Sequence, residues 1–290
     1  MAFVKLGVVG GGTMGQGIAE MLASAGLDVL LLEQTEEKLE LALHRIETSL
    51  DKQIEKWGIT SSEKKSILSR IQPASDIRAV ADCQMVIETI TENLEEKLAL
   101  FGQLDRICEP SVILASNTST LSLTELASAA AHPERVIGLH FVHPAAKIDL
   151  VEIVRGLKTS DTIYERTKSF VEDTIQKKGV MVYESPGFVT TRLINVLINE
   201  AMHTLSEGVA TAEDIDSAMR IGYHFKYGPL ELADRFGLDA VLAAMDRLFR
   251  EFGDLKYRPS HMLRQMVRAG RLGVKTGEGF FRYDKEGDRL

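Results

Sequence analysis

The stretch VKLGVVGGGTMGQGIAEMLASAGLDVLLLE, residues 4–33, decides the fold of this chain. A valine-rich strand over residues 4–9 runs directly into glycines 10, 12 and 15, which fit the spacing G-x-G-x-x-G. The apolar residues of 13–25 recur at helical spacing, and the apolar run over 28–33 has the length of a buried strand. The stretch therefore predicts a β-α-β unit with a glycine-rich turn, as in doubly wound α/β sheets.

The glycine turn predicts a dinucleotide site. Gly10 permits a tight turn, Gly12 lets the backbone approach a pyrophosphate, and Gly15 lets the helix pack closely on the strand. The pyrophosphate can then rest on the helix N-terminus, where Thr13 and Met14 lie. We predict that these five residues bind the cofactor.

The acid that ends the second strand selects between cofactors. Glu33 is placed to accept hydrogen bonds from an adenosine ribose. A 2′-phosphate would face this carboxylate, and neither Gln34 nor Thr35 is an arginine that would offset it. The sequence therefore predicts NAD rather than NADP.

The composition limits the remaining classes of function. The chain has 290 residues, 44% of them hydrophobic, a formal net charge of −8 and a pI of about 5.5. This size accommodates two domains, and the acidity argues against a nucleic-acid or anionic-membrane partner. No apolar run reaches the length of a membrane span, and the first strand leaves no room for a leader. Cys83 and Cys108 have no metal-type spacing. We expect a soluble, cytoplasmic protein without a metal.

Two consecutive helices follow the β-α-β unit. We predict the first over 36–57, capped by Thr35, and the second up to about residue 69, opened by the capping box TSSE at 60–63. This pair exceeds a minimal crossover and predicts a projecting lobe at about 35–70. Its polar face is either solvated surface or a phosphate contact, and it carries Ser49, Lys52, Lys56, Lys64 and Lys65.

Polar clusters follow the strands predicted at 85–88 and 112–115. Glu92 and Asn93 follow the first of these strands, and the run SNTS at 116–119 ends the second. Ligands of open α/β sheets bind beyond the carboxyl ends of the strands. We therefore expect both clusters to share one crevice with the glycine turn.

The stretch VIGLHFVHPAAKIDLVEIV, residues 136–154, supplies a candidate general base. It reads as two short apolar strands joined by a proline-containing loop. A hairpin-like return would bring His140, at the end of the first strand, beside Glu152 in the second, and such a pair orients a general base. A buried His–Glu pair also occurs as a purely structural element, so this stretch alone leaves both readings open.

The strand pattern stops after a helix predicted at 161–178 and a strand at 180–183. The run SPG at 185–187 marks the boundary, and only helices follow. We predict a Rossmann-type domain over 1–184 and an all-helical domain over 185–290, whose apolar faces suit a homodimer interface. The predicted helices of the second domain span residues 189–207, 211–220, 231–252 and 260–268.

Together these motifs resemble the short-chain L-3-hydroxyacyl-CoA dehydrogenase family, which includes 3-hydroxybutyryl-CoA dehydrogenases. The resemblance covers essentially the whole chain. The motifs that carry it are 7–20 (GVVGGGTMGQGIAE), 92–94 with Lys97, 115–121 (ASNTSTL), 138–154, 185–193 (SPGFVTTRL), 212–219 (AEDIDSAM), 228–239 and 275–280 (KTGEGF).

The resemblance implies NAD-linked oxidation of the 3-hydroxyl of an acyl-CoA to a 3-ketoacyl-CoA. It implies that His140 is the general base, that Glu152 is its partner, and that Ser119 hydrogen-bonds a substrate oxygen near the nicotinamide. It also implies a dimer through the helical domain. The ligand contacts that it implies are Glu92, Lys97 and Lys275 with the dinucleotide, Glu33 with its ribose, and Ser49 and Lys56 with the CoA nucleotide.

The chain departs from the family pattern around the substrate. His143 stands where the family usually has an asparagine after the catalytic histidine, and Thr191 stands where it has another active-site asparagine. The run GYHFKYGP at 222–229 is unusually aromatic and basic. We therefore expect an acyl group that is cyclic or carries a distal carboxylate. The alternatives are a dehydrogenase of a free hydroxy acid, as in the gulonate and carnitine branches, and a non-catalytic, crystallin-type NAD-binding protein.

Overall fold

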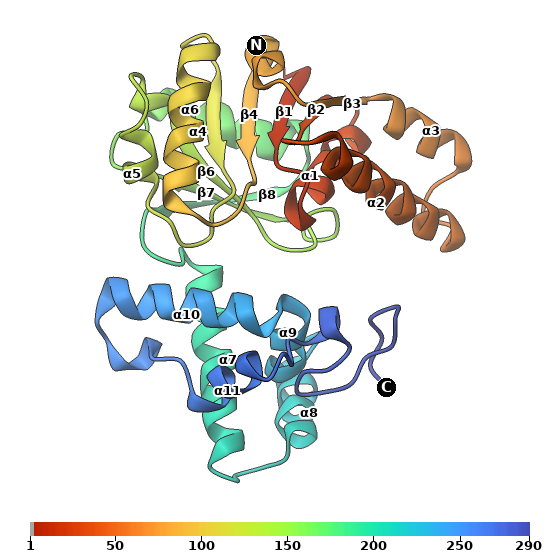
Figure 1. Cartoon of the computed structure of the whole chain (residues 1–290), viewed down its shortest axis with the longest axis vertical. Helices are drawn as coiled ribbons and strands as arrows, with labels where there is room; N and C mark the ends of the chain where they lie inside the picture. The colour runs from red at the N-terminus through yellow and green to blue at the C-terminus, as the bar shows by residue number, and fades with distance from the viewer. Residues whose placement is uncertain (1–2) are drawn as a thin grey trace. The chain divides into compact units, whose positions relative to one another are not determined.

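The computed structural model describes residues 3–290, and the chain forms two compact units, Met1–Ser185 and Pro186–Leu290 (Figure 1). The first unit is built on one eight-stranded sheet of order β3-β2-β1-β4-β5-β6-β7-β8. Neighbouring strands are parallel except β6 and β7, which are antiparallel. The strands are β1 (Lys5–Val9), β2 (Asp28–Leu32), β3 (Ile71–Ala74), β4 (Met85–Glu88), β5 (Ile113–Ser116), β6 (Val136–Phe141), β7 (Leu150–Arg155) and β8 (Lys178–Tyr183).

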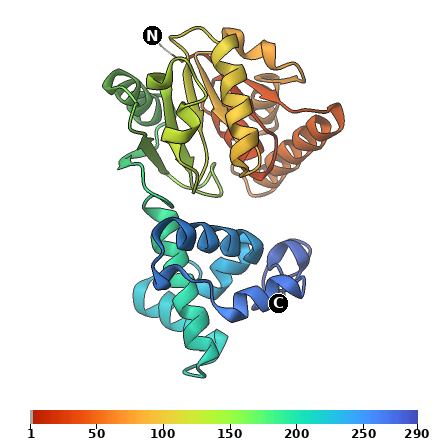
Figure 2. The same cartoon turned by 60° about the vertical axis from the view of Figure 1, so that its left-hand side comes forward.

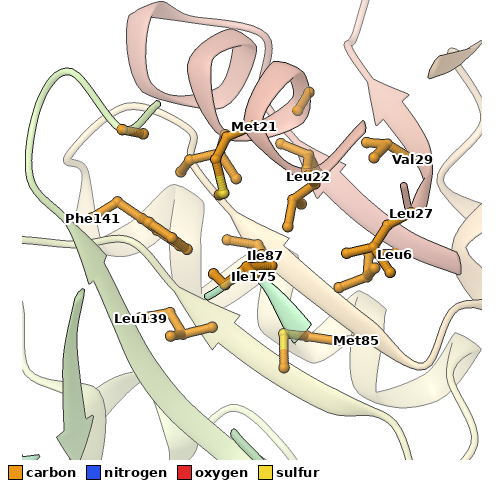
Figure 3. Close-up of a cluster of buried hydrophobic side chains, with 14 of the residues drawn as sticks. Leu6, Met21, Leu22, Leu27, Val29, Met85, Ile87, Leu139, Phe141 and Ile175 are labelled. Atoms are coloured by element: carbon orange, nitrogen blue, oxygen red, sulfur yellow. The ribbon is translucent and has the colours of Figure 1, made fainter. Parts of the chain in front are cut away.

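Helices cover both faces of this sheet. The helices α1 (Thr13–Ser24) and α6 (Asp161–Ser169) share one apolar core with alternate residues of the strands. Figure 3 shows Met21 and Leu22 of α1 above Leu6, Ile87 and Leu139 of the sheet. The helix α4 (Leu94–Ile107) lies along the sheet, in yellow in Figures 1 and 2, and contacts β5 and the short helix α5 (Leu123–Ala127). Burial of each large aliphatic side chain contributes about 1.5–3 kcal/mol to folding.

The edge strand β3 was missed by the sequence prediction, which passed directly from the helix pair to β4. Its sequence, IQPA, contains Pro73, which pairs with Leu31 of β2. Proline lacks a ladder donor, so it is confined to edges, and β3 has a neighbour on one side only. Pro73, which made this strand difficult to recognise from the sequence, is therefore compatible with a position at the edge of the sheet.

The predicted helix pair is present as α2 (Glu36–Glu55) and α3 (Ser61–Ser69), which project beyond the edge strands (Figure 1). Thr35 caps α2 by accepting a hydrogen bond from the backbone of Lys38. Thr60 and Glu63 form the predicted capping box of α3. The helix α2 ends two residues earlier than predicted.

The prediction of a helix over 161–178 is wrong at its end, because helical structure stops at Thr174. After α6 the chain widens into a π-helical turn over Phe170–Thr174, and β8 begins at Lys178 rather than at residue 180. Phe170 and Val171 are consecutive and both fully buried. Both side chains belong to the apolar core of the first unit.

The second unit is helical, with its own apolar core. The helix predicted at 231–252 is two helices, because Gly237 adopts a φ of 92° and breaks it. Asp216 caps the first of the two by accepting hydrogen bonds from the backbone of Leu230 and Glu231. The helices are α7 (Thr190–Ser206), α8 (Ala212–Tyr223), α9 (Pro229–Phe236), α10 (Leu238–Phe252) and α11 (His261–Arg268).

Candidate functional site

The glycine turn has the shape that a dinucleotide requires. Gly10 has a φ of 104°, and a Cβ on Gly15 would lie 1.7 Å from the carbonyl oxygen of Gly10. A Cβ on Gly12 would meet nothing within 4 Å. Gly10 and Gly15 therefore serve the turn and the packing of α1, whereas Gly12 borders open space at the helix N-terminus. Thr13 and Met14 form the first turn of α1 beside that space.

Glu33 follows β2 directly and faces the same turn. Its Oε1 accepts a hydrogen bond of 2.7 Å from the backbone of Gly11, and its Oε2 accepts one of 3.1 Å from Gln34. The carboxylate is thus held at the edge of the glycine turn, where sequence reasoning placed the adenosine ribose. The residues present fit NAD, while contact of Glu33 with the ribose stays a prediction.

The strands β6 and β7 bring His140 and Glu152 together. The two residues are directly opposite in the antiparallel register, and His140 Nδ1 lies 2.6 Å from Glu152 Oε2. His140 is 8% exposed and Glu152 is 1% exposed. The hairpin-like return expected from the sequence therefore builds a buried imidazole–carboxylate pair.

Glu92 holds the loop that carries Ser119. Its Oε1 accepts hydrogen bonds from the Thr118 hydroxyl at 2.5 Å and from the Ser119 and Thr120 backbone at 3.1 Å. Burial works to raise the pKa of Glu92, but the charge of Lys97 and these hydrogen bonds outweigh it and lower that pKa. The ionised form of Glu92 is therefore favoured, and with it the hydrogen-bonded form of the loop.

Lys97 lies beneath this loop and not at its surface. The residue is 1% exposed, and its ammonium lies 2.6 Å from Glu88 Oε1 and 3.4 Å from Glu92 Oε2. Direct contact between Lys97 and the dinucleotide stays a prediction, whereas its contact with both carboxylates is a feature of the fold. Burial raises the pKa of Glu88, and Lys97 opposes that effect.

Sequence reasoning missed two residues of this network. Glu88 also accepts a 2.6 Å hydrogen bond from Ser116, and the Asn117 side chain accepts one of 2.9 Å from the backbone of Phe141, next to His140. Glu88 ends a buried strand in an acid, as Glu33 follows one, so the same pattern pointed to it. Asn117 carried no separate signal, because its partner is 24 positions away in the chain.

The projecting lobe carries Ser49 and Lys56 on α2 and at its C-cap. Both lie on one helix face at positions seven apart. A buried acid that the sequence analysis did not single out, Glu20 of α1, accepts a 2.7 Å hydrogen bond from Gln53, and Ser49 is a further hydrogen-bond partner. Burial raises the pKa of Glu20, and Ser49, Gln53 and Lys147 oppose that shift.

The remaining predicted residues are distributed between the two units. In the first unit, desolvation and then the charge of Lys147 lower the pKa of His143, which favours a neutral imidazole. Thr191 and Lys275 belong to the second unit. The Lys275 ammonium lies 2.5 Å from Asp239. The contacts of these residues with cofactor or substrate stay predictions.

Over residues 3–290, the structure contains no cluster of three or more side chains suited to a metal ion. Within the same residues, no helix is both long and apolar enough to cross a membrane.

Comparison with known proteins identifies the family to which both units are similar. Residues 5–185 match the NAD-binding domain of 3-hydroxyacyl-CoA dehydrogenase, and residues 187–283 match its C-terminal domain. A probable 3-hydroxybutyryl-CoA dehydrogenase of Deinococcus radiodurans is 44% identical over 283 residues, which cover 97% of this chain and 100% of that protein. A 3-hydroxyadipyl-CoA dehydrogenase of Escherichia coli is 39% identical over 282 residues, which cover 96% of this chain and 59% of the relative.

A solved structure gives the same result. The crystal structure of (S)-3-hydroxybutyryl-CoA dehydrogenase from Ralstonia eutropha has a TM-score of 0.90 and 41% identity, and covers 98% of this chain and 100% of that one. Both halves of the chain thus match the two domains of one family in sequence, and the whole chain matches a solved member of that family in fold. The chain belongs to the 3-hydroxyacyl-CoA dehydrogenase family, whose members are oxidoreductases that act on CH–OH groups with NAD.

Proposed function

We propose that the protein oxidises the 3-hydroxyl of a short 3-hydroxyacyl-CoA to the 3-ketoacyl-CoA, reversibly, with His140 as the general base. The observation that carries the assignment is the buried contact of 2.6 Å between His140 Nδ1 and Glu152 Oε2. A hydrogen bond from Nδ1 to a carboxylate fixes the ring tautomer and leaves the basic lone pair on Nε2. His140 then accepts the hydroxyl proton at Nε2, and Glu152 stabilises the imidazolium.

The other residues hold the reactants. NAD, when bound, supplies the acceptor for the hydride that leaves C3. We assign its pyrophosphate to the glycine turn, its ribose to Glu33, and further contacts to Glu92, Lys97 and Lys275. Ser119 hydrogen-bonds the substrate oxygen, and its loop is held by four hydrogen bonds to Glu92 Oε1.

The substitution His140→Gln tests the chemical step. General-base catalysis contributes about 10²–10⁴-fold, so we expect kcat to fall by that factor while NADH binding, followed by its fluorescence, is retained. Near-wild-type turnover of the variant would remove His140 from the mechanism.

Substitution in the projecting lobe tests whether the substrate is a CoA thioester or a free hydroxy acid. We assign the CoA nucleotide to Ser49 and Lys56, and a free acid would not need either residue. Lys56→Glu should raise the KM for the acyl-CoA and leave the KM for NAD unchanged. An unchanged KM for the thioester, or turnover of the free acid at equal kcat/KM, would favour the free-acid reading.

A dicarboxylic acyl group is the second candidate substrate. His143 and the exposed Lys147 lie in the loop that follows the base, where Lys147 is close enough to influence the pKa of His143. A cation there suits a distal carboxylate, and the relative from Escherichia coli is named a 3-hydroxyadipyl-CoA dehydrogenase. In a panel of 3-hydroxyacyl-CoAs, the highest kcat/KM for 3-hydroxyadipyl-CoA would support this candidate, and the highest value for 3-hydroxybutyryl-CoA would exclude it.

We also propose a homodimer formed by the helical unit. Leu193 of α7 and Ile221 and Tyr223 of α8 are exposed apolar side chains that a second copy would cover. Light scattering should give twice the chain mass of 32.1 kDa. A cytoplasmic location fits Cys83 and Cys108, which are buried and form no disulfide.

A further inference from the structure

The C-terminal end of α2 carries one aromatic side chain in an unusual setting. Trp57 follows the C-cap residue Lys56 and is 95% exposed. Tryptophan is on average highly buried in folded proteins, and this is the single tryptophan of the sequence. Among the described residues 3–185, almost none of its apolar surface is covered.

The backbone at this position is also unusual for such a residue. The Trp57 N–H donates to the carbonyl of Ile54, and the Gly58 N–H donates to that of Gln53. These two bonds form a Schellman motif, whose left-handed position is usually a glycine. Here Trp57 holds that position with a φ of 58°, although a glycine stands next in the chain. A large side chain is thus kept where both its exposure and its backbone conformation are unfavourable, which points to a function.

Unpaired cations lie beside the tryptophan. Lys52 and Lys56 are exposed, one helical turn apart, and within residues 3–290 neither forms an ion pair. By contrast, the neighbouring Lys64 is paired with Glu47 and Asp51. Ser49 lies on the same helix face, about 12 Å along the axis from Trp57. A hydroxyl, two ammonium groups and an aromatic ring therefore follow one another along the lobe.

We infer that Trp57 stacks on the adenine ring of the CoA moiety while Lys52 and Lys56 contact its phosphates. Stacking between a base and an aromatic side chain is sequence-independent and suits an exposed ring, because every base offers a flat face. The Schellman motif fixes the backbone that carries the ring, so the stacking surface is available before the ligand arrives. This inference rests on the proposed acyl-CoA activity and extends it to the recognition of the nucleotide.

The single tryptophan makes the test direct. Its fluorescence, excited at a wavelength where the ligands do not absorb, should be quenched by CoA and by adenosine 3′,5′-bisphosphate, but not by NAD. Unchanged emission at saturating CoA would overturn the inference, and so would equal quenching by NAD.

Variants give an independent measurement. Trp57→Ala and Trp57→Gly should raise the KM for the acyl-CoA about 5- to 30-fold, with kcat and the KM for NAD unchanged, because stacking is worth about 1–2 kcal/mol at an exposed site. Trp57→Phe should retain most of the affinity. Glycine relieves the left-handed strain, so Trp57→Gly should unfold at the same or a higher temperature than the wild type. A weaker CoA interaction in an equally stable protein excludes a folding defect.

A truncated substrate separates this inference from the proposed function. With a 3-hydroxyacyl-pantetheine thioester, which lacks the nucleotide, the wild type and Trp57→Ala should have the same kcat/KM. A difference that persists with this substrate would contradict the stacking role. Absence of turnover with any 3-hydroxyacyl thioester would refute the proposed function, while the quenching by CoA would still decide the role of Trp57.

Discussion

Gly12 and Gly15 belong to one motif but have different surroundings. A side chain on Gly15 would overlap the carbonyl of Gly10 and lie 2.6 Å from the Thr89 hydroxyl, whereas Gly12 has open space. The φ of Gly12 is −65°, a value that any residue adopts. At the scale of single residues, Gly15 therefore serves packing, and the open space beside Gly12 is where we expect the ligand to approach.

A matched pair of alanine substitutions tests this division. Gly15→Ala should lower the free energy of unfolding by about 2–3 kcal/mol or more, because α1 must move away from the turn. Gly12→Ala should leave the melting temperature unchanged but weaken NADH binding by about tenfold or more, because its methyl group occupies the path of the pyrophosphate. Thermal unfolding and NADH fluorescence distinguish the two effects, and equal losses of stability would contradict the assignment.

The charged residues Lys97, Glu88 and Glu92, which lie near Ser119, contribute unequally to stability. Removal of Lys97 leaves the buried Glu88 without a cation and takes the same partner from Glu92, whose side chain is 37% exposed, whereas removal of the charge on Glu88 leaves a balanced Lys97–Glu92 pair. The network therefore depends more on the ammonium than on the deeper carboxylate.

We expect Lys97→Met to cost about 3–5 kcal/mol of stability and Glu88→Gln about 1 kcal/mol. The variant that combines Lys97→Met with Glu88→Gln should be more stable than Lys97→Met alone. It removes one of the two negative charges that Lys97→Met leaves without a cation. Urea unfolding of the wild type, the two single variants and the double variant gives the free energies of unfolding for this double-mutant cycle. If Lys97→Met is as stable as the wild type, the ammonium does not hold the network.

At the scale of elements, α9 is joined to the C-terminal segment by one buried acid. Asp234 accepts hydrogen bonds from the backbone of Phe280 and Phe281 and from the hydroxyl of Tyr283. This contact fixes the segment that carries Lys275. Burial raises the pKa of Asp234 from 3.8 to about 6, against the effect of these hydrogen bonds.

The raised pKa gives a pH dependence of definite sign. A group whose pKa is higher in the folded state contributes stability below its unfolded pKa and loses it as the pH rises through the folded value. For Asp234 the window runs from about pH 4 to pH 6. The wild type should therefore gain about 1–2 kcal/mol relative to Asp234→Asn between pH 7 and pH 4.5. Tyr283→Phe, which keeps the acid, should follow the wild type, and parallel curves for wild type and Asp234→Asn would contradict the shift.

At the scale of the whole molecule, each unit has its own apolar core. The glycine turn, Glu33, Glu92 and the His140–Glu152 pair all belong to the first unit. Lys275 and Thr191 belong to the second. The first unit therefore contains most of the proposed dinucleotide site and the whole proposed proton-transfer pair.

Residues 1–185 should accordingly fold and bind NADH without the rest of the chain. We expect a cooperative thermal transition and, if Lys275 contacts the dinucleotide as proposed, a weaker NADH affinity than in the full chain. Lys275→Ala in the full chain should reproduce this loss of affinity. A fragment that does not unfold cooperatively would show that the first core depends on the second unit.

The sequence by itself predicted the β-α-β unit, the helical second half, NAD as the cofactor and the pairing of His140 with Glu152. These features depend on local periodicity, on turn residues and on spacing within a hairpin, and short stretches of sequence are enough to specify each of them. Only the tertiary structure decided the edge strand β3, the break at Gly237, the burial of Lys97 between two carboxylates and the anchor from Asn117 to β6. The edge strand and the Asn117 anchor depend on partners distant in the chain. The break at Gly237 and the ion pairs of Lys97 involve residues near in the chain, but the backbone conformation of Gly237 and the burial of Lys97 are features of the folded unit. Propensity and spacing therefore did not specify them.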